Sequence, residues 1–171
     1  MSRCLFLQLK GLGGPPSRAL SAELDQIYTA QPKVSLQFAL VPVLQDASTG
    51  PYFGDYVTRL CKGALASHQN DLLALVLASN AQPWSENVIG VLQRLLTTAR
   101  PPLSALSSVL EAQASHHADS KKFGALLLLV CTQHLSKSAE AASVERLRRA
   151  VEAHTTFMKR ACLAQLDKLT A

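Results

Sequence analysis

Apolar residues recur three and four positions apart along most of this chain, with polar residues between them. That period is typical of amphipathic α-helices, and prolines, glycines and serine-rich breaks divide the chain into separate segments. The pattern predicts helices over 18–29, 34–45, 52–65, 68–79, 84–98, 103–115, 120–134, 140–152 and 154–169. Pro42 should kink the second helix or begin a new turn, because proline lacks the N–H that a helix interior needs.

The short breaks between these helices determine the expected fold. Consecutive helices joined by short loops pack antiparallel, and leucine-rich centres such as 72–77 and 126–130 recur without a fixed period. We therefore expect an all-α protein, built as an irregular HEAT-like stack of antiparallel helical hairpins. Residues 1–171 should form a single helical-repeat domain, with 1–16 a flexible leading segment.

Composition agrees with a helical core and argues against a membrane. Hydrophobic residues make up 48% of the chain and aromatic residues 5%, a mixture that favours helices over strands. The longest clean apolar run, 125–131, is roughly a third of the length that a membrane span needs. We expect neither export nor membrane insertion, and we predict that Cys4, Cys61, Cys131 and Cys162 are buried thiols in a reducing compartment.

The excess positive charge is confined to the last third of the chain. Residues 121–171 contain nine Lys or Arg and four Asp or Glu, whereas residues 1–120 contain eight of each. The whole net charge of +5 therefore belongs to the carboxyl-terminal part. This segregation indicates a partner at that end of the molecule.

No residue pattern points to catalysis, a cofactor or a metal. No histidine pairs with a carboxylate or a second histidine at the helical zinc spacing, and no Gly-x-Ser-x-Gly turn is present. His116 and His117 are adjacent, so on a helix they would point about 100° apart, and we expect a solvated loop pair. An enzyme is the disfavoured alternative, since it would need a deep pocket lined by titratable residues.

Lys121 and Lys122 break an ordinary helix rule. They occupy the first turn of a strongly apolar helix, where cations oppose the positive end of the helix dipole. Either Asp119 or Ser120 caps the helix and the lysines are simply solvated, or the two lysines bind a partner.

Phe157 is the second unusual position. On a helical wheel it lies about 120° from the apolar stripe and beside Arg160 and Lys168. Either the ring packs under the preceding helix, or it is an exposed interface anchor next to cations. The candidate partner-binding residues are Phe157, Arg160, Lys159, Lys168, Lys121 and Lys122. Nucleic acid is an alternative partner for these cations, although stacking aromatics are scarce in this region.

Three stretches, in order, resemble one protein family. They are Trp84-Ser85-Glu86 and the leucines after it, Lys122-Phe123-Gly124 with the apolar run that follows, and Thr155-Thr156-Phe157 close to the end of the chain. Over about residues 84–171, and weakly before them, the chain resembles the C-terminal domain of Fanconi anaemia complementation group E proteins.

The resemblance implies a non-catalytic, all-helical, HEAT-like adaptor in the nuclear Fanconi core complex, a ubiquitin ligase for interstrand crosslink repair. It implies two partners, the group C subunit and the substrate heterodimer that is monoubiquitinated. In that family a phenylalanine near the chain end contacts the substrate, and the matching residue is Phe157. Family members are longer, so the chain is expected to be a fragment, a short isoform or a trimmed form.

Overall fold

The computed structural model describes residues 13–46, 48–79, 82–136 and 138–170. These residues form helices and connecting turns, and none of them lies in a strand, so the all-α prediction is confirmed. The chain divides into two compact units. The amino unit comprises Met1–Ser79 and Trp84–Val91, and the carboxyl unit comprises Asn80–Pro83 and Leu92–Ala171.

The amino unit is a set of short helices around a leucine-rich core. It contains α2 (Arg18–Ala30), α3 (Pro32–Ser35), a π-helical turn (Leu36–Leu40), α4 (Val41–Gln45), α5 (Tyr52–Lys62), a 3-10 turn (Ala66–His68), α6 (Gln69–Ala78) and the first half of α7 (Glu86–Leu96). Its largest fully buried side chains include Tyr28, Leu40, Phe53, Leu72 and Ile89.

The π-helical turn ends at Leu40, two residues before Pro42. In this turn the Val41 N–H donates to the Leu36 carbonyl, five residues back. A proline ring clashes with the carbonyl four residues before it in a regular α-helix, and a wide π turn takes the backbone out of that register. Pro42 accordingly lies in the first turn of α4, as predicted.

α7 begins at Glu86, two residues later than predicted, because the preceding residues are held by side-chain bonds. Ser85 Oγ accepts the Val88 N–H at 3.2 Å and donates to the Leu44 carbonyl at 2.7 Å. Asn87 is buried and its amide donates to the carbonyl of Gly50 at 3.1 Å. The start of α7 is therefore fixed by contacts across the amino unit.

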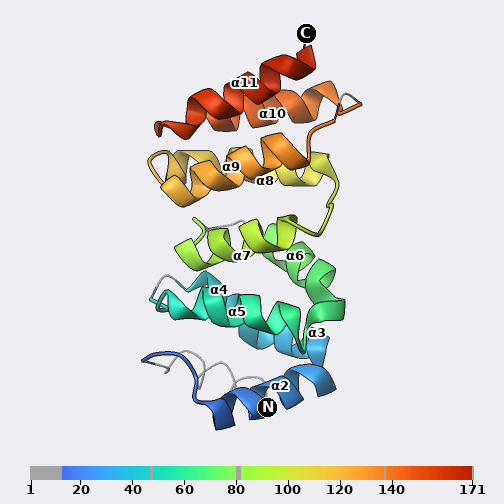
Figure 1. Ribbon diagram of the computed structural model, residues 1–171, viewed down its shortest axis with the longest axis vertical. Coiled ribbons are helices and arrows are strands. Elements are labelled where there is room, and N and C mark those ends of the chain that lie inside the picture. The colour runs from blue at the N-terminus through green and yellow to red at the C-terminus, as the bar shows by residue number, and fades with distance from the viewer. Residues whose placement is uncertain (1–12, 47, 80–81, 137, 171) are drawn as a thin grey trace. The chain divides into compact units, whose positions relative to one another are not determined.

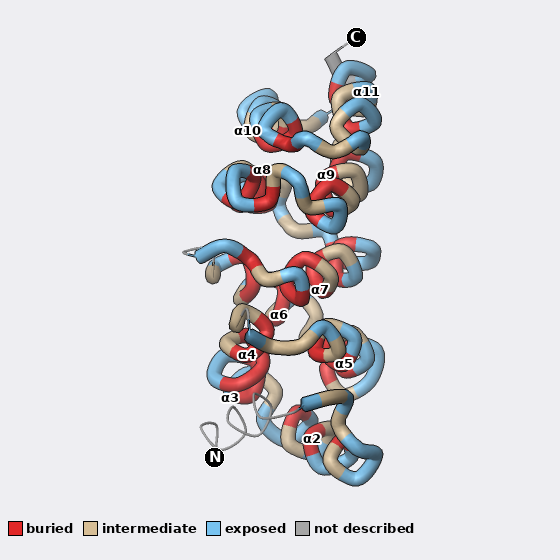
Figure 2. The backbone as a smooth tube through the Cα atoms, turned by 90° about the vertical axis from the view of Figure 1, so that its left-hand side faces the viewer, coloured by how far each residue is buried: buried red, intermediate tan, exposed pale blue. Residues whose placement is uncertain are grey.

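The carboxyl unit contains two helical hairpins, in addition to the second half of α7. The first pairs α8 (Leu103–Ala114) with α9 (Lys121–Gln133), and the second pairs α10 (Ala141–Glu152) with α11 (Met158–Thr170) (Figure 1). α10 packs on α8 and α11 packs on α9, with the buried positions on the facing sides (Figure 2). The HEAT-like repeat and the single domain over 1–171 stay predictions.

The structure also bears on the leading segment, the cysteines and the prediction about membrane insertion. Within the predicted leading segment 1–16, residues 1–12 lie outside the described residues, and 13–16 contain bends and no helix. Cys61, Cys131 and Cys162 are free, buried thiols, as predicted, whereas Cys4 lies outside the described residues. Burial raises the pKa of Cys61 to about 11, which keeps it protonated at neutral pH. In the described part of the chain, no helix is long and apolar enough to span a membrane.

Gly90 offers a test of the helical packing in α7. A Cβ placed there would meet no atom within 4 Å, and alanine loses less backbone entropy than glycine in a helix. We expect Gly90→Ala to raise the free energy of unfolding by about 0.5–1 kcal/mol in urea denaturation followed by circular dichroism. Gly54→Ala is the matched control and should not raise the free energy of unfolding in the same way, since its Cβ would lie 3.1 Å from Asn87 Oδ1. A loss of stability in Gly90→Ala would contradict the packing of α7.

Candidate partner-binding site

Two loops meet at one end of the carboxyl unit, where α8 turns into α9 and α10 turns into α11 (Figure 1). The Thr155 N–H donates to the Ala118 carbonyl at 2.7 Å, and Thr155 Oγ1 donates to the same oxygen at 3.0 Å. We call residues 115–122 and 153–160 the loop end. The loop end includes the predicted candidates Phe157, Lys159, Arg160, Lys121 and Lys122.

The predicted helix over 154–169 begins later, at Met158. The reason is His154, whose side chain is buried, with its Nε2 only 2.7 Å from Thr156 Oγ1. Burial of this ring and the two hydrogen bonds from Thr155 to the Ala118 carbonyl hold the backbone of 153–157 away from helical geometry. Lys159 Nζ donates to the Glu152 carbonyl at 2.5 Å and so caps the carboxyl end of α10.

Phe123 and Gly124 form the surface on which this loop rests. The Phe123 ring is fully buried, with its centroid 5.3 Å from that of His117 and 6.3 Å from that of His154. A Cβ at Gly124 would collide with His154 Nε2 and would lie 3.0 Å from Thr156 Oγ1. Two of the stretches that carry the family resemblance, 122–124 and 155–157, therefore meet at the loop end.

The prediction of a solvated histidine pair is wrong for His117. His116 is exposed, but His117 is buried against Phe123, because the 3-10 turn Ser115–His117 directs it inward. Among the described residues, no group of three His, Cys, Asp or Glu side chains is placed to hold a metal ion.

Phe157 is the residue just before α11 and does not lie on a helical face, so the wheel geometry is wrong. The side chain is 76% exposed, the highest value among the large hydrophobic residues described as exposed. Packing of the ring under the preceding helix, one of the two expectations, is therefore excluded.

The lysines at the start of α9 are exposed and do not cap the helix themselves. Ser120 is the cap, because its Oγ accepts the Phe123 N–H at 3.2 Å, which decides between Asp119 and Ser120. Arg160 is exposed in the first turn of α11. Lys168 lies ten residues further along α11 than Met158, about 15 Å at 1.5 Å per residue, so the structure separates it from the loop end.

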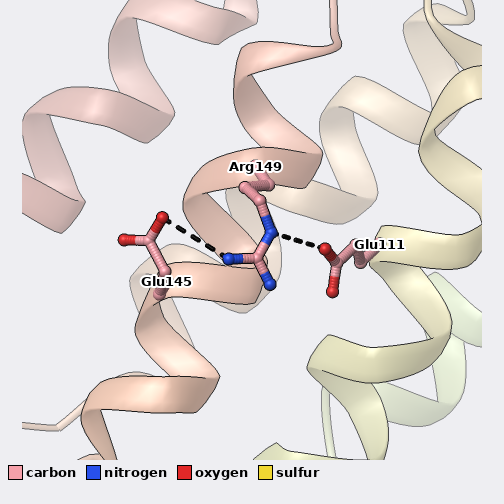
Figure 3. A network of polar contacts seen from close by, with 3 residues as sticks. All are labelled: Glu111, Glu145 and Arg149. Atoms are coloured by element: carbon pink, nitrogen blue, oxygen red, sulfur yellow. Dashed lines mark hydrogen bonds and ion pairs between the residues drawn. The ribbon is translucent and has the colours of Figure 1, made fainter.

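Two of the arginines in the basic carboxyl-terminal third are committed to ion pairs. Figure 3 shows Arg149 between Glu111 of α8, at 2.6 Å, and Glu145 of α10, at 3.5 Å. Arg148 pairs with Asp167 of α11 at 2.8 Å. The hydrogen bond from Arg149 lowers the pKa of Glu111, so that carboxylate stays charged. These arginines bind neighbouring helices and contribute little net charge to the surface.

Burial shifts two histidines of the carboxyl unit. It holds the pKa of His154 below the ordinary 6.5; the Lys159 ammonium lowers it further, while a bond to the His117 backbone and the Asp119 carboxylate oppose the shift. Burial also lowers the pKa of His134, whose Nε2 donates to the Leu96 carbonyl at 2.9 Å. Both rings are therefore neutral at physiological pH.

The arrangement as a whole is suited to binding. It combines an exposed ring and exposed cations with a support made of the buried His154 and Gly124 and the hydrogen-bonded Thr155, none of which was a sequence-based candidate. One available signal was the pair of consecutive threonines, because threonine favours helix caps over helix interiors.

A model of the family described as Fanconi Anaemia group E protein FANCE matches residues 1–170. The match extends beyond the segment 84–171 that carries most of the resemblance. No curated protein and no solved structure matches the chain.

Acid should destabilise the carboxyl unit through His154. The folded protein binds fewer protons on this ring than the unfolded chain does. The contribution of the neutral His154 ring to the free energy of unfolding is therefore complete above pH 6.5 and is lost as the pH falls through the lowered pKa. Urea unfolding between pH 7.5 and about 5 should show a falling free energy of unfolding, with a shallower fall in His154→Gln. His116→Gln, which replaces an exposed ring, should keep the wild-type slope. If the free energy of unfolding fell equally with pH in all three proteins, His154 would not be the source of the acid sensitivity.

Proposed function

We propose that this chain, which belongs to the Fanconi anaemia group E protein family, is a non-catalytic adaptor of the Fanconi core ubiquitin ligase. Family membership makes it a protein of the Fanconi anaemia pathway, which implies a role in DNA repair. The finer proposal is that it acts in the nucleus and recruits the substrate heterodimer for monoubiquitination in interstrand crosslink repair.

The exposure of Phe157 is the observation that carries this proposal. A phenylalanine that is 76% exposed at a turn, between buried supports and exposed cations, has the composition of an interface hot spot. The partner surface that fits it is an apolar pocket with acidic residues around the rim. Aromatic burial in the pocket supplies affinity, and the rim charges supply orientation and association rate.

The cations take different parts in this proposal. Arg160, Lys121 and Lys122 are exposed at the loop end and are proposed to face the acidic rim. Lys159 already binds the end of α10, so its main contribution is to the fold of the loop. Lys168 is proposed to lie outside the contact because of its distance along α11.

The group C subunit is the second partner that we propose. The amino unit offers a separate exposed apolar pair for it, Val34 at 42% and Phe38 at 54% exposure. These residues are one turn apart on the helical stretch that contains the π turn. We propose that the group C subunit binds the earlier helices while the loop end takes the substrate.

Phe157→Ala should weaken binding of the full chain to the purified substrate heterodimer by about 2 kcal/mol, or about thirtyfold, if the ring fills a central pocket. Calorimetry or biolayer interferometry measures the change, and the rate of monoubiquitination by the reconstituted core complex should fall with it. Phe38→Ala is the matched control for the affinity measurement alone, since it also removes an exposed phenylalanine, from the amino unit, and should leave the affinity for the heterodimer unchanged. Unchanged affinity in Phe157→Ala removes the site assignment.

Arg160→Glu should slow association with the heterodimer about three- to tenfold at low salt, because it reverses a charge that would face the acidic rim. The salt dependence of the rate should also become flatter. Lys62→Glu makes the same charge change on an exposed residue of α5 and should leave the rate unaltered. If duplex DNA competes with the heterodimer in this assay, the nucleic-acid alternative gains support instead.

A further inference from the structure

We propose that Gly124, His154 and Thr155 are positioning residues, which hold Phe157 in its exposed orientation and thereby set the affinity for the partner. The inference rests on the proposed function, because it concerns the residue assigned there. It concerns residues that act through Phe157 and do not themselves need to touch the partner.

The exposed ring has little packing of its own, so its backbone must fix its direction. Each of the three residues before Phe157 is anchored separately. His154 is buried, Thr155 makes two hydrogen bonds to the Ala118 carbonyl, and Thr156 Oγ1 lies 2.7 Å from His154 Nε2. An anchor that is already oriented loses less conformational freedom when it binds.

Gly124 makes this anchoring geometrically feasible. Glycine is a poor helix former, yet it occupies the first turns of α9, where a Cβ would strike the His154 ring and crowd Thr156 Oγ1. The His154 ring has no simple escape, because it is buried beside Phe123. A methyl group at position 124 must therefore displace the loop that leads to Phe157.

The loop contacts lie close enough to Phe157 for displacement to reach it. Thr156 is its direct neighbour, and the Lys159 N–H donates to the Thr156 carbonyl at 3.1 Å, across the start of α11. A shift of Thr156 therefore moves both the backbone of Phe157 and the first turn that carries Arg160. The exposed ring and its neighbouring cation should move together.

The test uses the full chain with 4-fluorophenylalanine incorporated only at position 157, observed by fluorine NMR. Gly124→Ala should shift or broaden the resonance and weaken binding of the substrate heterodimer about tenfold, with the protein still folded by circular dichroism. Gly90→Ala is the matched control, because it makes the same change in a helix where the Cβ meets open space. It should leave both the resonance and the affinity at their wild-type values.

Thr155 provides a second route in case Gly124→Ala does not fold. Thr155→Val keeps the side-chain shape and removes the hydroxyl that donates to Ala118, whereas Thr155→Ser keeps the hydroxyl. We expect the valine variant to alter the fluorine resonance and to lower affinity about threefold, and the serine variant to restore both. A residue that only stabilised the fold would lower the urea midpoint without changing the resonance of the folded protein.

The two proposals fail in different ways. Wild-type affinity in Phe157→Ala removes the assignment of Phe157 as the substrate-binding site, and the fluorine resonance then decides whether the three residues position the ring. Wild-type resonance and wild-type affinity in both folded Gly124→Ala and Thr155→Val overturn the positioning inference, even if Phe157→Ala abolishes binding. An altered resonance together with lower affinity in either variant supports both proposals.

Discussion

The close approach of His154 and Thr156 to the bare backbone of Gly124 is the constraint on which the loop end depends. A buried imidazole needs room and a polar partner, and here the missing side chain gives the room while the Thr156 hydroxyl is the partner. The Thr155 N–H donates to the Ala118 carbonyl in place of a carbonyl four residues back, so residues 153–157 do not continue as a regular helix. The late start of α11 and the exposed position of Phe157 accompany these contacts of 154–156.

The ion pairs determine which part of the surface has a positive electrostatic potential. Arg148 and Arg149 are each within 3 Å of a carboxylate from another helix, so their fields are largely cancelled close to the surface. Arg160 and the lysines that open α9 remain exposed at the loop end. At physiological ionic strength a charge is screened over about 8 Å, so the field of these cations reaches only a molecule that is already close.

The sequence predicted the helices well and their ends less well, for a physical reason. Burial of one face repeats every three or four residues, so the pattern is visible locally in helices such as α9 and α10. The ends depend on partners far along the chain: Leu44 holds the residue before α7, and Ala118 holds the loop before α11. The burial of His117 is equally non-local, because it requires the Phe123 ring.

The candidate site could be located but not constructed from the sequence. Phe157 stands out beside cations in any periodic analysis, and the family resemblance pointed to the same residue. Its true setting in a turn follows from the contact between Gly124 and His154, which no local pattern records. Lys168 illustrates the opposite error, since a helical wheel removes distance along the axis and so places it beside residues that lie turns away.

The π turn at Leu36–Leu40 has a consequence for the phase of the amino unit. Its wider winding absorbs one residue, so the apolar faces before and after it both point inward, with Leu36, Val43 and Leu44 all buried. Wound as an uninterrupted α-helix, the same residues would rotate everything beyond the turn by about 100°. Val43 and Leu44 would then turn from the protein interior toward solvent. This single irregular turn therefore keeps the apolar faces of both halves of the helical stretch on the same side.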